Sequence, residues 1–223
     1  MDDCIAACDF DAWEGAAEAL AGGLLHLVAV AAAASANRPN AVGHITQRRL
    51  QQLDQPSGRT DFVLQARETV VKMSSLMGMP RAINALHSLA AAVPQDSDLA
   101  RELAAAPVLR GDADYSHARM RARGLELFSA IYGRHAATVE DRLHALCPDL
   151  AEVIVVDSYG RLLGETRRLS ARDTELCAVG CLVPLDVPAQ LKSHCLGASR
   201  LGASDAMVQA AIRLARLVCT RRP

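Results

Sequence analysis

The sequence predicts an all-α protein, and three observations lead to that fold class. Apolar residues make up 51% of the 223 positions while aromatic residues make up only 3%, so alanine and leucine carry the core. Alanine and leucine interleaved with glutamate and arginine favour helix over strand. Segments of helical length repeatedly begin at a capping residue and end at glycine or proline. The β-branched run Val153–Val156 could form a strand, but no partner strand is evident, so we expect helix there too.

The first half is expected to be helical from its first tryptophan onward. Trp13–Ala36 reads as one long, mostly buried helix that cannot continue past Pro39. A short polar helix over His44–Leu53 follows, and Thr60 is expected to cap a helix that runs to about Met77.

Two further helices complete this half. Pro80 can open a helix that reaches about Val93, and Ser97 can cap a short helix that ends at Ala105. The stretch 107–114 resembles a linker. We therefore expect an N-terminal helical half over 1–110 and a second helical domain over 111–223.

The second half shows clearer capping signals. Ser170-x-x-Asp173 is a loose capping box, and Gly133 and Gly202 are positioned to end helices. Arg119, Arg121 and Arg123 alternate along the first of these helices and are expected to form a solvated face. The expected helices are Ser116–Tyr132, His135–Leu146, Asp149–Leu163, Ser170–Val183, Pro188–Leu201 and Ser204–Cys219.

A weak internal repeat relates the two halves. Ala66-Arg67-Glu68 and Ala171-Arg172-Asp173 each lead a helix that breaks at a proline-containing kink and then restarts. A duplicated helical hairpin is the simplest interpretation of this pattern.

Composition excludes several classes of function. The formal charge of −1 argues against a nucleic-acid partner, and the few aromatic residues argue against a platform that stacks single strands. Ala19–Ala36 lacks formal charge but is weakly apolar, so we expect a buried helix and no membrane partner. No positive N-terminal segment suggests a signal peptide, and the chain ends in Arg-Arg-Pro instead of a peroxisomal tripeptide. We expect the cytoplasm by default and leave an organelle open.

The cysteines indicate a reducing compartment. Their number is odd and no Cys-x-x-Cys pair occurs, so a disulfide framework is not expected. No His/Cys cluster has metal-site spacing, so the sequence predicts no metal and no cofactor. The seven are Cys4, Cys8, Cys147, Cys177, Cys181, Cys195 and Cys219.

About residues 115–218 resemble the carboxymuconolactone decarboxylase-like family, which includes the AhpD-type alkylhydroperoxidases. The first half resembles the same family weakly through Ala66–Glu68 and Gly78–Leu86. This resemblance implies an all-α fold and a homo-oligomer. The matching segments are Arg123–Gly133, Pro148–Leu150, Tyr159–Leu163, Ala171–Leu176, Gln190–His194 and Gly197–Ser204.

The peroxidase branch of that family carries a dithiol motif that begins at a glutamate. When the glutamate of the motif is aligned with Glu175, the last histidine of the motif aligns with His194. The two cysteine positions of the motif align with Val187 and Gln190. A dithiol peroxidase needs a low-pKa thiolate and a resolving partner. The match therefore resembles the decarboxylase-like branch, and we expect no dithiol peroxidase activity.

Glu175 and His194 are the candidate catalytic residues. They lie on consecutive helices joined by a short turn, so their side chains are expected to meet. A carboxylate beside an imidazole suits acid–base chemistry on a small anionic or lactone substrate, with Lys192 and Arg200 as partners for the anion. Cys195, next to His194, could add thiol chemistry.

Three functions stay open at this stage. One is a decarboxylase-like lyase, and another is a non-catalytic helical protein that keeps the fold for assembly or binding. The third is a thiol-dependent peroxidase rebuilt on Cys177, Cys181 and Cys195. A helix that is apolar all round must be covered, so we expect a homo-oligomer with the Leu20–Ala36 helix near an interface.

Overall fold

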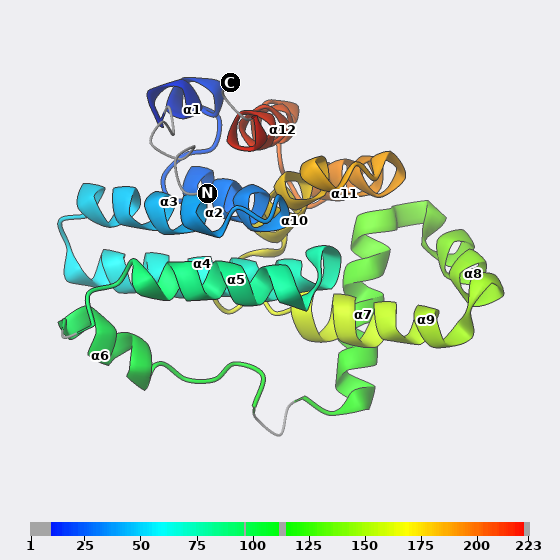
Figure 1. The fold of residues 1–223 in the computed structure, drawn as a ribbon. Helices are drawn as coiled ribbons and strands as arrows, with labels where there is room; N and C mark the ends of the chain where they lie inside the picture. The colour runs from blue at the N-terminus through cyan, green and yellow to red at the C-terminus, as the bar shows by residue number, and fades with distance from the viewer. Residues whose placement is uncertain (1–9, 96, 112–114, 221–223) are drawn as a thin grey trace.

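The all-α class is confirmed in a computed structural model that describes residues 10–95, 97–111 and 115–220, in which no strand occurs (Figure 1). The expectations for Cys4 and Cys8 lie outside the described residues. The first half contains α1 (Phe10–Ala16), α2 (Leu24–Ser35), α3 (Pro39–Gln52), α4 (Pro56–Met77), α5 (Met79–Ala91) and α6 (Asp98–Ala105). The second half contains α7 (His117–Tyr132), η1 (Gly133–His135), α8 (Ala136–Leu146), α9 (Pro148–Glu152), η2 (Val153–Leu163), α10 (Ala171–Leu182), η3 (Val183–Leu185), α11 (Pro188–Arg200) and α12 (Asp205–Cys219).

Helix α2 forms the centre of the core. Its residues from Leu25 to Ser35 are all buried, and α3, α4, α10 and α12 pack around it. Small side chains allow this close approach: a Cβ added to Gly180 of α10 would lie only 2.9 Å from Val28 Cγ1. Because α10 and α12 come from the second half of the chain, the two halves share one core.

The prediction of a single helix over Trp13–Ala36 is wrong. Helix α1 ends at Ala16 and α2 begins at Leu24, and Gly22 between them has a positive φ of 65°. That backbone conformation suits glycine and breaks the helix. Helices of the same chain cover α2, so its burial does not by itself require a second copy.

Two helix starts were also placed too late. Helix α3 begins at Pro39 and α4 begins at Pro56, each with proline in the first turn, where a missing backbone N–H costs nothing. Thr60 is not a cap, since its hydroxyl donates to the Pro56 carbonyl inside α4.

The other signals for helix ends are confirmed. Gly133 and Gly202 have positive φ values of 56° and 95° at the ends of α7 and α11. Serine side chains accept backbone N–H bonds at four helix starts, namely Ser97 of α6, Ser116 of α7, Ser170 of α10 and Ser204 of α12.

The run Val153–Val156 is helical, as expected, but it belongs to the π-helix η2. This wider helix lies directly against α7. A Cβ on Gly124 would lie 2.0 Å from Val155 O, and one on Gly160 would lie 2.1 Å from Met120 O. The two backbones are therefore in contact, which fixes the position of Tyr159 on η2.

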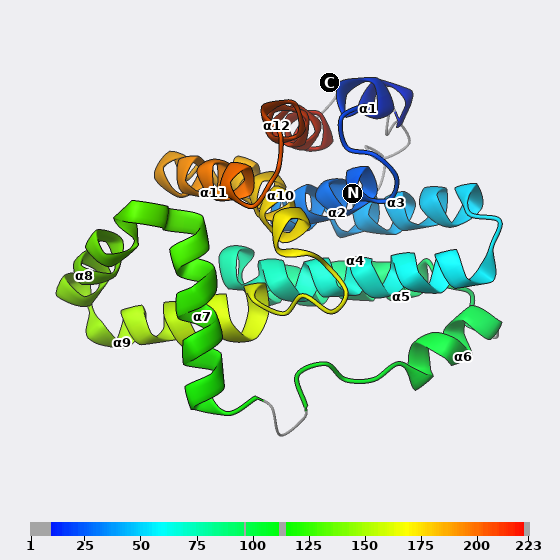
Figure 2. The same cartoon turned by 180° about the vertical axis from the view of Figure 1, so that it is seen from behind.

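The two predicted hairpins are present as α4–α5 and α10–α11. Seen from both sides, α8 and α9 project away from the rest of the helices (Figures 1 and 2). Among the described residues, no helix is long and apolar enough to cross a membrane.

Candidate active site

The predicted contact between Glu175 and His194 is present. Nδ1 of His194 lies 2.8 Å from Oε2 of Glu175, and both side chains are buried. A carboxylate can only accept, so Nδ1 carries the proton and donates it. This leaves Nε2 of His194 as the nitrogen that can take up or release a proton.

Helix α11 comes unusually close to the carboxylate. A Cβ on Gly197 would lie 2.7 Å from Glu175 Oε2 and 2.7 Å from Ile131 Cγ2. Glycine at this position therefore allows the hairpin α10–α11 to close around the pair.

Two tyrosines of η2 and α7 extend the site. The hydroxyls of Tyr132 and Tyr159 lie 3.1 Å apart, and the Phe128 ring packs against both. Burial raises the pKa of both phenols, that of Tyr159 well above its ordinary value, and the negative charge of Glu175 adds to the effect. The phenols therefore stay protonated and can donate hydrogen bonds.

The pKa of His194 is raised above its ordinary value. Burial lowers this pKa, but the charge of Glu175 and the hydrogen bond between the two side chains together outweigh burial. This raised pKa favours the imidazolium–carboxylate form of the pair.

One oxygen of the pair has no donor among the described residues. Oε1 of Glu175 is buried and makes no hydrogen bond. A buried carboxylate oxygen without a donor costs about 1–3 kcal/mol or more, so a water or a ligand group is expected to meet it.

The predicted anion-binding residues lie on other faces of α11. Lys192 is exposed, and the guanidinium of Arg200 donates to the Ile131 carbonyl at the end of α7. At 100° per residue, neither shares the face of α11 that carries His194. The proposed pairing of these cations with a substrate at His194 is therefore not supported by their placement.

The cysteines near the pair are poorly suited to form thiolates. Burial raises the pKa of Cys177 and of Cys181 to about 12. Cys195 is half-buried, and burial together with the charge of Glu175 raises its pKa as well. A raised pKa lowers the thiolate fraction that peroxide chemistry requires.

The sequence analysis missed a buried charged network next to this site. Lys72 of α4 is fully buried, and its Nζ donates to Leu163 O at 2.9 Å and to Thr174 Oγ1 at 2.8 Å. Burial lowers the pKa of Lys72 to about 8, although Glu68 opposes that change. The signal was a lysine inside the apolar run 70–73.

The geometry of η2 explains why this lysine is buried. The last carbonyls of a helix have no backbone donor, and its C-terminus carries partial negative charge. Cationic side chains satisfy four successive carbonyls of η2: Arg123 bonds Gly160 O, Arg110 bonds Arg161 O and Leu162 O, and Lys72 bonds Leu163 O. The prediction that Arg123 lies on a solvated face is therefore wrong.

Buried carboxylates balance these cations. Arg110 forms a bidentate ion pair with Glu68, in which Nη1 lies 2.9 Å from Oε2 and Nη2 lies 2.5 Å from Oε1. Glu165 accepts hydrogen bonds from Tyr115 and Arg167. This network fixes the end of η2 and hence the helix that carries Tyr159.

His26 is a core histidine whose ring is only partly satisfied. It is buried and its ring packs edge-on to Phe62, but Nδ1 has no partner among the described residues. Burial and the charges of Arg49 and Arg48 lower its pKa to about 4, so it is neutral near neutral pH.

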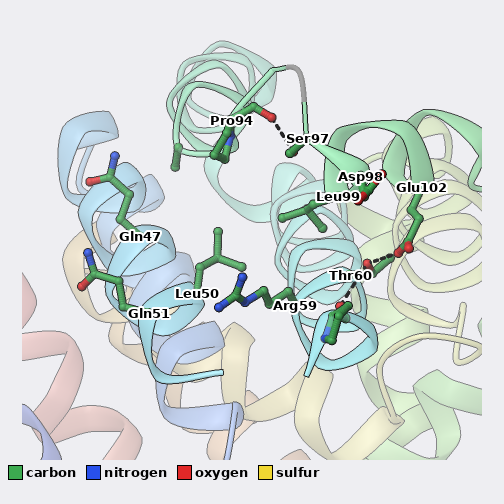
Figure 3. Close-up of a pocket in the computed structure, with 12 residues that line it drawn as sticks. Gln47, Leu50, Gln51, Arg59, Thr60, Pro94, Ser97, Asp98, Leu99 and Glu102 are labelled. Carbon is green, nitrogen blue, oxygen red and sulfur yellow. Dashed lines mark hydrogen bonds between the residues drawn. The ribbon is translucent and has the colours of Figure 1, made fainter. Parts of the chain in front are cut away.

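A hollow lies away from this pair. It has a volume of about 700 Å³ and lies between α3, α4, α6 and the end of α5. In Figure 3 Gln47 and Gln51 of α3 lie on one side, opposite Asp98 and Glu102 of α6, and Arg59 of α4 lies between them. No group of three or more potential metal ligands occurs among the described residues.

Fold and site together define an all-α protein built around a buried carboxylate–imidazole pair. The chain is 31% identical over 191 residues to Peroxisomal protein 2 of Schizosaccharomyces pombe, a match that covers 86% of this chain and 83% of that protein. It is also 31% identical over 170 residues to Peroxisomal protein 2 of Saccharomyces cerevisiae, covering 68% of this chain and 59% of that protein. The chain belongs to the Peroxisomal protein 2 family. No protein-family model and no solved structure matches it.

Proposed function

We propose that this protein is an enzyme in which Glu175 and His194 carry out acid–base chemistry on a small substrate. The observation that carries this proposal is the buried 2.8 Å contact together with the unsatisfied oxygen of Glu175. The open oxygen supports this proposal because it offers a hydrogen-bond acceptor to a polar group of a substrate.

Each group has a distinct role in the proposed reaction. Glu175 fixes the Nδ1–H tautomer of His194 and stabilises the imidazolium, while Nε2 moves the proton. Tyr132 and Tyr159, whose pKa values the charge of Glu175 helps to raise, provide neutral hydroxyl groups that can donate.

The resemblance to the carboxymuconolactone decarboxylase-like family suggests a small anionic or lactone substrate. In such a decarboxylation the bond between the carboxylate carbon and the adjacent carbon breaks, and carbon dioxide leaves. The electron pair stays on the adjacent carbon, which then takes the proton from the imidazolium of His194.

Carboxymuconolactone is the probe that tests this proposal. Turnover is expected in the wild type and in Lys192→Gln, whose side chain is exposed, and is expected to be lost in His194→Gln. Unchanged turnover in His194→Gln would exclude the proposed proton transfer. Absence of turnover in the wild type would exclude this substrate.

A specific observation favours a second candidate, a non-catalytic helical protein. Neither the hollow of about 700 Å³ between α3, α4 and α6 nor a hollow of about 320 Å³ beside η2 is lined by Glu175 or His194. In this alternative the pair is a buried hydrogen bond that holds α10 to α11. His194→Gln would then lower the free energy of unfolding by about 1–3 kcal/mol, and no substrate would change the protein's stability.

The third function, a peroxidase rebuilt on other cysteines, receives the least support. The raised pKa values of Cys177, Cys181 and Cys195 disfavour an attacking thiolate. Thiol-dependent turnover of a hydroperoxide that Cys195→Ser abolishes would establish this function against our expectation.

The names of both relatives suggest a location. We propose that this protein acts in peroxisomes, which specifies the organelle that the sequence left open. Fluorescent fusions tagged at either end should co-localise with a peroxisomal marker in yeast cells. A diffuse cytoplasmic signal from both fusions would contradict this location.

A further inference from the structure

The hollow of about 700 Å³ shown in Figure 3 lies apart from Glu175 and His194. It lies between α3 and α6, next to the first turns of α4. Sites that bind small molecules usually have volumes of roughly 300–1,000 Å³, so this hollow has room for a ligand larger than a single amino acid. We call it the α3–α6 hollow.

A cation with unused nitrogens lies in the α3–α6 hollow. Nε of Arg59 donates to the Leu53 carbonyl at 2.7 Å, which anchors the guanidinium. The two Nη atoms make no hydrogen bond or ion pair with any residue that the structure describes. In Figure 3 the guanidinium points towards Leu50, on the α3 side. Two free Nη donors match the two oxygens of a carboxylate, so this side suits the acidic end of a ligand.

The opposite side of the hollow carries carboxylates. Asp98 is paired with Arg101 on the same helix, whereas Glu102 has no cationic partner in the described part of the chain. One oxygen of Glu102, Oε2, contacts the Thr60 hydroxyl, and the other oxygen is left for a ligand. A ligand with negative charge alone would be repelled here, and one with positive charge alone would be repelled by Arg59. The two sides together favour a ligand that carries both charges.

Neutral groups lie between and beside the charged sides. Leu50 of α3 and Leu99 of α6 face each other across the hollow in Figure 3. Gln47 and Gln51 lie one helical turn apart on α3, and their amides bond to no other described residue. A side-chain amide both donates and accepts hydrogen bonds, as the peptide group of a ligand does. The lining therefore provides an apolar contact together with partners for peptide groups.

We propose that the α3–α6 hollow binds a short peptide with free ends, whose carboxylate pairs with Arg59, whose ammonium pairs with Glu102 and whose apolar side chain lies between Leu50 and Leu99. A single amino acid carries both charges on one carbon and does not reach both sides. An extended chain gains about 3.3–3.6 Å per residue, so a peptide of about two or three residues spans the hollow. This site does not depend on the chemistry proposed for Glu175 and His194.

Titration of isotope-labelled protein with the tripeptide glycyl-leucyl-glycine, followed by nuclear magnetic resonance, tests the proposal. Saturable shifts are expected at α3, α6 and the first turns of α4. Acetylation of the amino end and amidation of the carboxyl end each remove one charge of the peptide. Each change should weaken binding by about tenfold, because one charge-assisted hydrogen bond is lost.

Two variants connect each charge of the peptide to one side chain. Glu102→Gln should bind the free and the acetylated peptide equally, and Arg59→Gln should bind the free and the amidated peptide equally. Matched controls are Glu126→Gln and Arg142→Gln, which neutralise exposed side chains outside the hollow and should bind like the wild type. The same spectra show whether each variant is folded. His194→Gln should also bind like the wild type, which separates this site from the proposed enzyme chemistry.

Three results would overturn the proposal. One is the absence of saturable shifts with the free tripeptide. Another is wild-type binding of the acetylated peptide that is as tight as binding of the free peptide, which would indicate a site for simple carboxylates. The third is a preference for the free peptide that persists in both Arg59→Gln and Glu102→Gln.

Discussion

Replacing Lys72 with methionine should change how the protein's stability depends on pH. The folded state lowers the pKa of Lys72 from 10.5 to about 8, chiefly through burial. Between these two values the unfolded chain binds the proton more tightly than the folded chain does. The contribution of Lys72 to stability is therefore least favourable below about pH 8 and rises as the pH increases towards 10.5.

The magnitude follows from the size of the pKa shift. One pKa unit corresponds to about 1.4 kcal/mol. The free energy of unfolding of the wild type, minus that of Lys72→Met, should thus rise by roughly 2–3 kcal/mol between about pH 7 and about pH 10. Taking the difference cancels the titration of groups that do not interact with Lys72, such as Cys181.

Urea unfolding at several pH values, followed by circular dichroism, measures this difference. The chain contains two lysines, so Lys192→Met is a matched control at an exposed position. Carbon-13 labelling of lysine should also give two signals, and the signal absent in Lys72→Met should titrate near pH 8. A stability difference that stays constant across this pH range would refute the reasoning.

Further predictions concern the site and its neighbours. Gly197→Ala should lower the free energy of unfolding by roughly 1–3 kcal/mol, because its Cβ would overlap the Glu175 carboxylate. Gly15→Ala should leave the free energy of unfolding unchanged, because a Cβ at this position meets open space. Thermal unfolding of both variants measures the difference. The hydrogen bond of His194 to Glu175 should stabilise the protein at low pH, and this contribution should be lost as the pH rises through the raised pKa of His194. Unfolding scans at a series of pH values should show this loss in the wild type and not in His194→Gln. Cys177 and Cys181 should resist alkylation in the native protein and react after unfolding, which peptide mass spectrometry can resolve. Rapid native labelling of either thiol would contradict its burial.

Local sequence determined most of the helices. The serine caps at Ser97, Ser116, Ser170 and Ser204 are encoded within one turn of each helix, so they could be predicted without the fold. The contact between Glu175 and His194 was predictable for a similar reason, because a short turn restricts how two consecutive helices can pack.

Tertiary structure decided the features that depend on distant residues. No local pattern shows that Lys72 reaches Leu163 and Thr174, which lie 91 and 102 positions away in the sequence. Its burial follows from the unsatisfied carbonyls at the end of η2, which Lys72 can reach only once that helix is placed against α4. Likewise α2 is covered by α10 and α12, so its apolar surface is satisfied within one chain. The sequence by itself determined those helix ends that carry a serine cap or a glycine, because capping is local, whereas burial and pairing depend on which helices meet.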